Sequence, residues 1–168
     1  ILAMYIVSIC LPIKEETSFF KKVELSEYNL VDNRTDNSYM DSIVLIGLDE
    51  LRIQGVAVLL KPLVNQKLKN GMELRGLLKP YSKNKYLMAV GNLSKDQAIN
   101  TISHELLHLH QFHTKRLVIT PISVRWHNRL YTRNVPEYHK RPWEIEAFAV
   151  GRLLEIKIRQ RLISKINN

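Results

Sequence analysis

Two histidines and a glutamate in one short stretch are residue types that can bind a metal ion and act on a water molecule. The stretch reads Thr101-Ile-Ser-His-Glu-Leu-Leu-His108. In a helix, residues four apart differ by only about 40° in direction, so His104 and His108 project side by side. Two neutral imidazoles placed this way can hold one Zn²⁺, and Glu105 on the adjoining strip can take a proton from a metal-bound water. The stretch therefore indicates a hydrolytic metal site.

A helix is predicted where this chemistry requires one. Ser94-Lys-Asp-Gln97 is a capping box that opens a helix, which we expect to continue to about His113. Thr101 and Gln111 share the face of the two histidines and are candidates to orient an imidazole. His110 and His113 flank the motif and are alternative ligands, although such histidines more often pack or face solvent. The core-facing stripe of this helix is predicted to be Ala98, Ile99, Ile102, Leu106 and Leu109.

A catalytic zinc site needs a third protein ligand, and the candidates are Glu144 and Glu146. Residues two apart on a helix point about 160° away from each other, so only one of them can face the metal. Glu146 is favoured because small residues beside it, Ala147 and Ala149, would let its helix approach the motif helix closely. Glu144 is explained as a favourable charge in the first helical turn.

Two side chains just before this segment are candidates for a catalytic role. Tyr138 or His139 could stabilise the oxyanion that forms on a carbonyl under attack. The alternative is that Tyr138 only packs against its neighbours.

The other elements are predicted from periodicity and turn residues. We expect a helix over residues 48–69 kinked at Pro62, a hairpin of residues 73–79 and 85–90, and a last helix starting at Pro142. Residues 32–38 read as an exposed loop and residues 114–141 as a long connection. The last helix has apolar residues at Ile145, Phe148, Ala149, Leu153, Ile156 and Ile163.

Length and composition predict one domain over residues 1–168. The net charge of +9 is high and suggests an acidic partner, which could be nucleic acid, an anionic surface or an acidic substrate, but no recognition helix stands out. The single Cys10 excludes an internal disulfide. The apolar run of residues 1–13 is too short to span a bilayer and reads as a buried strand, or as part of a signal sequence.

The second half of the chain resembles the zincin metallopeptidases, and specifically small metallopeptidases of phage and bacterial genomes. The resemblance covers residues 70–155 and leaves residues 1–45 as an unassigned N-terminal segment. It rests on the following residues: Glu73-Leu-Arg-Gly76, Tyr86, Leu93-Ser94, Asp96-Gln97-Ala98, the motif with Gln111, Tyr138, and Arg141-Pro-Trp-Glu-Ile-Glu-Ala147. In thermolysin-like enzymes and in the repressor-cleaving phage peptidases, the ligand glutamate directly precedes an alanine, which the resemblance carries over to Glu146 before Ala147. Val150 stands where thermolysin-like enzymes have an aspartate.

The resemblance implies an α+β fold in which the edge strand of a small twisted sheet lies above the active-site helix. Residues 85–90 would be that edge, with Tyr86, Met88 and Ala89 beside an extended peptide substrate.

We therefore expect a monomeric zinc metallopeptidase with one Zn²⁺ per chain, held by His104, His108 and Glu146. Glu105 would be its general base, and Tyr138 a second catalytic residue. The alternatives are another metal-dependent amide hydrolase, acting for example on the cell wall, and a basic nucleic-acid-binding protein on an inactive scaffold. A cytoplasmic location is favoured, with secretion or membrane association as the alternative if residues 1–13 belong to a signal sequence.

Overall fold

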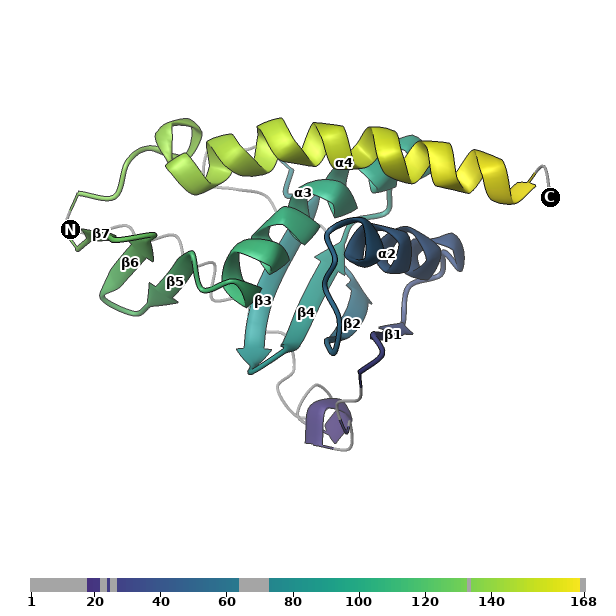
Figure 1. Cartoon of the computed structure of the whole chain (residues 1–168), viewed down its shortest axis with the longest axis horizontal. Helices are drawn as coiled ribbons and strands as arrows, with labels where there is room; N and C mark the ends of the chain where they lie inside the picture. The colour runs from purple at the N-terminus through teal and green to yellow at the C-terminus, as the bar shows by residue number, and fades with distance from the viewer. Residues whose placement is uncertain (1–17, 22–23, 25–26, 64–72, 133, 167–168) are drawn as a thin grey trace.

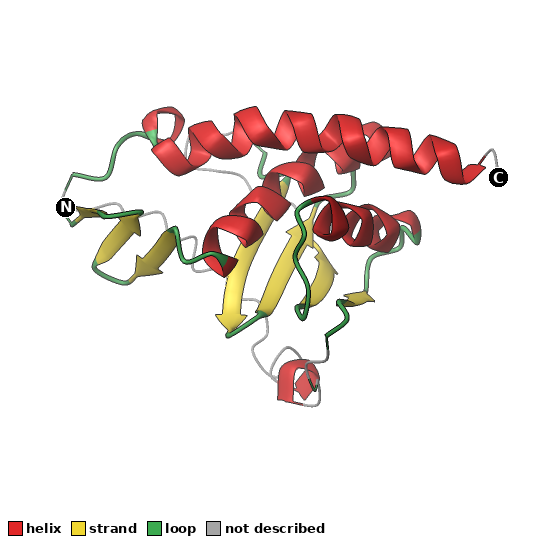
Figure 2. Cartoon of the chain, viewed as in Figure 1, coloured by secondary structure: helices red, strands yellow, loops and turns green. Residues whose placement is uncertain are grey.

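The described part of the chain folds into two β-sheets and a layer of helices (Figures 1 and 2). The structure is a computed structural model, and it describes residues 18–21, 24, 27–63, 73–132 and 134–166. The chain contains both helices and strands, and several strands follow one another without a helix between them, so the fold is α+β, as predicted.

The larger sheet has four strands in the order β1-β2-β4-β3. The first three run parallel, and β3 is antiparallel to β4. The strands are β1 (Leu30–Asn33), β2 (Ala57–Pro62), β3 (Gly76–Ser82) and β4 (Lys85–Val90). The predicted hairpin is therefore confirmed, with its turn at Ser82–Lys85. The prediction that residues 85–90 form the sheet edge is wrong, because β4 lies between β2 and β3. The edge of this hairpin is β3.

Helices α2 (Tyr39–Glu50) and α3 (Lys95–His113) supply the main core on one side of this sheet. They pack on side chains of β2 and β4 such as Val58, Leu60 and Met88. A smaller cluster of Phe20, Leu59 and Leu87 involves the alternate residues of the same strands, which point to the opposite face. Both central strands are consequently covered on both faces.

Helix α3 begins as the sequence predicts. The Ser94 hydroxyl accepts a hydrogen bond from the Gln97 backbone N–H, and the Gln97 side chain accepts one from the Ser94 N–H. This reciprocal cap fixes the first turn. The predicted core-facing stripe is buried in full: Ala98, Ile99, Ile102, Leu106 and Leu109.

Helix α4 (Pro142–Ile166) starts at Pro142, as predicted, and crosses over α3 and α2 along the length of the molecule (Figure 1). Its inward face consists of Ala147, Gly151, Leu154 and Ile158, all buried. A Cβ added at Gly151 would lie 3.4 Å from the His104 Cα, so the two helix backbones are close at the turn that carries His104. Within the described residues, no helix is long and apolar enough to cross a membrane.

The stretch expected to be a long connection contains a second sheet. Its antiparallel strands are β5 (Leu117–Thr120), β6 (Ser123–Trp126) and β7 (Arg129–Tyr131), followed by the short 3₁₀ helix η1 (Tyr138–Lys140). Leu117, Val124 and Tyr131 pack with Trp143 in the first turn of α4. This small sheet therefore holds the beginning of α4 in place.

The predicted helix over residues 48–69 is wrong. Helix α2 ends at Glu50, and Ala57–Pro62 is the strand β2. A strand buried on both faces has an unbroken apolar run, here Ala57-Val-Leu-Leu60, which lacks the alternation of a half-exposed strand. Part of the predicted loop at 32–38 is also strand, since β1 extends to Asn33. Residues 64–69 of the helix prediction, and the prediction for residues 1–13, lie outside the described residues.

Candidate metal centre

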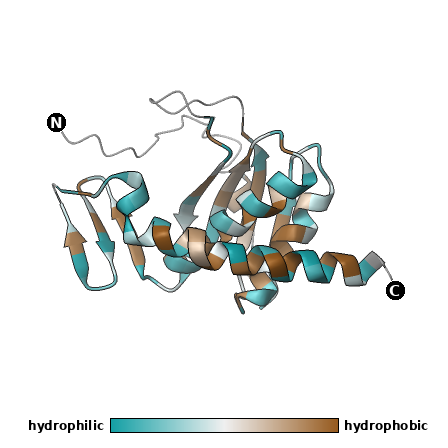
Figure 3. Cartoon of the chain, turned by 90° about the horizontal axis from the view of Figure 1, so that it is seen from above, coloured by the Kyte–Doolittle hydropathy of each residue, from teal (hydrophilic) through white to brown (hydrophobic). Residues whose placement is uncertain are grey.

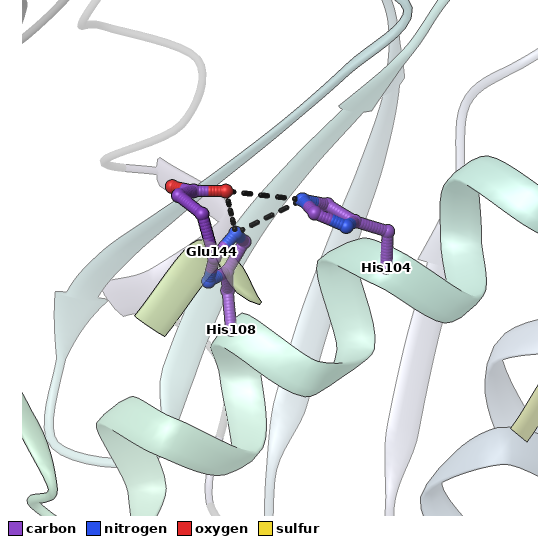
Figure 4. A group of neighbouring side chains, drawn as sticks. All are labelled: His104, His108 and Glu144. Carbon is purple, nitrogen blue, oxygen red and sulfur yellow. Dashed lines mark hydrogen bonds and ion pairs between the residues drawn. The ribbon is translucent and has the colours of Figure 1, made fainter. Parts of the chain in front are cut away.

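Three potential ligand atoms converge where α3 meets the first turn of α4 (Figure 4). His104 and His108 project from successive turns of α3, as predicted, and the Glu144 carboxylate points toward both rings. The two Nε2 atoms are 3.1 Å apart. Glu144 Oε2 lies 3.4 Å from His104 Nε2 and 3.2 Å from His108 Nε2. All three side chains are largely buried.

These spacings suit a tetrahedral metal ion. Ligand atoms bound at about 2.0–2.1 Å with tetrahedral angles lie about 3.3–3.4 Å from one another, close to the separations found here. Two imidazoles and one carboxylate leave the fourth position of such an ion open, which is the donor set of a catalytic rather than a structural zinc site. The group can therefore hold a metal ion.

The expected third ligand was Glu146, and the structure corrects this assignment. Glu146 forms an ion pair with Arg116, and its other carboxylate oxygen accepts a hydrogen bond from Gln111 Nε2 at 2.9 Å. It is Glu144 that meets the histidines. The two glutamates do point in different directions, as predicted. The rotation of α4 about its axis decides between them, and Ala147, on which the choice of Glu146 rested, turns its small side chain into the core.

Gln111 orients one imidazole, as its place on the helix predicts. Its Nε2 donates to the Trp143 carbonyl and to Glu146, so its Oε1 is left as the acceptor facing His108 Nδ1 at 2.9 Å. A proton on Nδ1 then leaves the lone pair of a neutral His108 on Nε2, the atom that faces Glu144. Glu146 thus acts on the site indirectly, through Gln111. Thr101, the other predicted donor, is buried against Gly76 instead.

The side chain of Glu105 extends from α3 toward the edge strand β3. This side chain is buried, and burial raises the pKa of its carboxyl, against the opposing effect of His108 and His104. The backbone N–H of Leu78 on β3 donates to this carboxylate. A Cβ at Gly76 would come within 2.8 Å of Glu105 Oε1 and within 2.5 Å of Thr101 Cγ2, so β3 approaches this closely only because residue 76 is glycine.

Charge coupling within the site is strong. Burial would lower the pKa of His108, but the hydrogen bond and charge of Glu144, together with the charge of Glu105, raise it to about 9. Burial would raise the pKa of Glu144, but its hydrogen bonds with His104 and His108 hold it well below the usual range. Without a metal, the cluster therefore carries a proton on His108 beside an ionised Glu144.

Tyr138 lies in this cluster and His139 does not. Tyr138 is half exposed, but partial burial beside Glu144 raises its pKa, and so do the charge of Glu144 and a hydrogen bond to it. The phenol therefore stays protonated and remains a donor. His139 is exposed and pairs with Glu137. Of the flanking histidines, His110 contacts Arg116 through Nδ1, and neither it nor His113 belongs to the three-residue group.

The expected substrate-facing residues are not available to a substrate. Tyr86, Met88 and Ala89 are all buried in β4, between two neighbouring strands. Burial also raises the pKa of Tyr86 to about 12. The exposed edge nearest the site belongs to β3, which the sequence did not distinguish from its partner strand.

Three residues near the site were not among the site residues predicted from the sequence: Arg116, Gly76 and Phe148. The Phe148 ring lies 4.5 Å from the His104 ring, measured between centroids. Gly76 carried a signal, because a glycine within a strand often marks a close approach of another group.

Comparisons of the chain with protein-family models, with curated proteins and with solved structures gave no match.

Proposed function

We propose that this protein is a zinc-dependent peptidase of the zincin type. The observation that supports it is the convergence of His104, His108 and Glu144 on one point, with the buried carboxylate of Glu105 on the same helix turn. A site built only to stabilise the fold has no need of the fourth group, whereas hydrolysis needs a base.

Each residue then has a distinct role. Zinc bound there would supply a Lewis acid for the carbonyl and lower the pKa of a water molecule. Glu105 accepts the proton of the attacking water and passes it to the leaving amine, for which a raised pKa is suited. Tyr138 keeps its proton and can donate a hydrogen bond to the developing oxyanion. Gln111 holds His108 in the required tautomer.

An extended peptide substrate would pair with β3, the strand beside the site. β3 forms the sheet edge, and its Leu78 N–H already reaches Glu105. A peptide that pairs with this edge would run past Glu105 and present its backbone carbonyls there. Pro80 has no backbone N–H to donate to a neighbouring strand, and a proline is therefore tolerated in an edge strand such as β3.

The nucleic-acid alternative receives less support from the structure. Several basic residues are engaged in ion pairs within the molecule: Arg34, Arg116, Lys140, Lys157, Arg159 and Arg161. The alternative of a different amide hydrolase uses the same catalytic residues, so substrate profiling must separate it from a peptidase.

The test combines metal content with turnover. Elemental mass spectrometry of the purified protein should give about one zinc per chain, and none in His108→Gln. Glu105→Gln should retain zinc and lose cleavage of an unstructured protein such as casein by a factor of 10³ or more, roughly the scale of losing an essential catalytic group. No metal uptake by the wild type, or equal cleavage by Glu105→Gln, would refute the proposal. Hydrolysis of peptidoglycan amides without cleavage of peptides would favour the alternative hydrolase.

A further inference from the structure

Helix α4 has a second apolar face that no described element covers. Its inner face packs on α3 and α2, yet five large apolar side chains on the opposite side are each 48–61% exposed. Together with three intervening residues, they form what we call the outer stripe: Ile145, Phe148, Ala149, Arg152, Leu153, Ile156, Gln160 and Ile163. Figure 3 shows apolar segments recurring along this helix.

The outer stripe is too long to be incidental. At 1.5 Å per residue it extends for about 27 Å, the length of a helix or extended segment of a partner. Single exposed apolar residues are ordinary on a protein surface, but a continuous row of them usually marks an interaction site.

The charge of the outer stripe favours an acidic partner. The stripe contains Arg152 and no acidic residue. The glutamates of α4 are all used elsewhere: Glu144 by the histidines, Glu146 by Arg116, and Glu155 by Arg159 and Asn100. A second copy of this chain packed stripe against stripe would supply no acidic side chain to face Arg152, and each copy carries a net charge of +9.

The outer stripe also begins at the candidate metal centre. Phe148 is exposed, lies on the ring of His104 and is 6.3 Å from the Tyr138 ring, measured between centroids. A partner lying along the stripe would therefore have one end beside the reacting atoms. A substrate segment bound along the stripe would reach the candidate site, whereas binding of the protein to an extended surface such as a membrane needs no such contact.

We propose that the outer stripe of α4 binds an acidic, amphipathic segment of a protein substrate and thereby selects which protein is cleaved. The inference rests on the proposed peptidase function for the meaning of the contact. The contact itself needs neither metal nor turnover. The apolar side of the segment would cover Leu153 and Ile156, and its acidic side chains would face Arg152.

The experiment measures binding apart from cleavage. The probe is a fluorescently labelled amphipathic helix of leucine and glutamate, about 18 residues long to match the stripe. It is titrated by anisotropy onto the full chain carrying Glu105→Gln, with and without a chelator. We expect saturable binding that Leu153→Ser/Ile156→Ser weakens at least tenfold. The matched control is Ile119→Ser/Ile122→Ser, which removes two exposed isoleucines from β5 and the turn that follows it and should leave the affinity unchanged.

Charge reversal gives a second readout. Arg152→Glu should weaken the glutamate probe and strengthen a probe in which lysine replaces glutamate. The inference is overturned if the probe binds both serine variants equally. It is also overturned if sedimentation shows a dimer that Leu153→Ser/Ile156→Ser dissociates, or if the stripe binds anionic vesicles and not the peptide. Binding that persists in a protein without metal or cleavage would keep the inference and refute the peptidase, whereas cleavage without probe binding would do the reverse.

Discussion

Glu144 and Glu146 stand two residues apart on α4, and their carboxylates serve different partners. Glu144 faces the two imidazoles of α3, whereas Glu146 is held by Arg116 and Gln111. One glutamate is therefore placed to bind a metal ion directly, and the other supports the residue that orients His108.

This difference predicts unequal effects of the same substitution. Glu144→Gln removes one of the three proposed ligands and should lower zinc affinity by a factor of about 10³ or more. Glu146→Gln keeps all three proposed ligands and should lower zinc affinity about 10–100-fold, because Glu146 acts only through the Gln111 side chain that orients His108. Competition with a chromophoric chelator measures both. Equal losses, or a larger one for Glu146→Gln, would reinstate Glu146 as the ligand.

Gln111→Leu tests the orienting amide. The substitution leaves the Trp143 carbonyl and the Nδ1–H of His108 without their partner. We expect unfolding free energy to fall by about 1–3 kcal/mol and zinc affinity to fall about 10–100-fold. Gln160→Leu, an exposed substitution on α4, is the control and should change neither. Unchanged affinity in Gln111→Leu would show that His108 needs no outer partner.

Metal binding should depend on pH. Since the pKa of His108 is raised to about 9, the metal-free protein carries a proton there at neutral pH, and a metal must displace it. Below about pH 9, zinc affinity should rise about tenfold per pH unit, with about one proton released per ion. The pKa of Glu144 is well below this range and contributes no slope. Calorimetry in buffers of different ionisation enthalpy counts the protons, and a pH-independent affinity would contradict the coupling.

Gly76→Ala tests the contact between β3 and Glu105. The added Cβ would meet Thr101 and Glu105 at distances that require one of them to move. We expect a cost of about 1–3 kcal/mol in stability and reduced turnover, with zinc retained because neither residue is a ligand. Gly91→Ala follows the same hairpin but meets its nearest neighbour at 3.5 Å, so it should be nearly neutral. Normal turnover in a folded Gly76→Ala would remove the role given to this contact.

Tyr138→Phe separates the catalytic role from packing. If the phenol donates to the oxyanion, kcat should fall about 10²-fold while zinc affinity changes little. If Tyr138 only packs, the substitution should change neither kcat nor zinc affinity, because phenylalanine keeps the ring. Single-turnover cleavage by zinc-loaded protein makes the comparison.

The sequence predicted the site better than the sheet that surrounds it. The capping box and the apolar stripe define α3 almost to the residue, because both are local signals. The central strand β2 was mistaken for a helix, since a strand covered on both faces has no alternation. Which strand of the hairpin forms the edge depends on the pairing of β4 with the distant β2, and no local pattern reports it.

The place of Glu144 beside the two histidines was within reach of a sequence argument. Glu144, Ala147, Gly151, Leu154 and Ile158 recur at helical spacing and share one face of α4. The small residues at 147 and 151 mark that face as the one that meets α3. The larger residues of the outer stripe, which form a second apolar face, obscured this signal in the sequence.

The candidate ligands come from two helices, His104 and His108 from α3 and Glu144 from α4, and the small sheet lies between them in the chain. A metal ion bound by all three would act as a cross-link that closes this intervening loop. Separating α4 from α3 would then also require releasing the ion, so its binding energy would add to the free energy that holds the two helices together. The concentration of available zinc would in this way add to the stability that α4 already gains from its buried Ala147, Leu154 and Ile158.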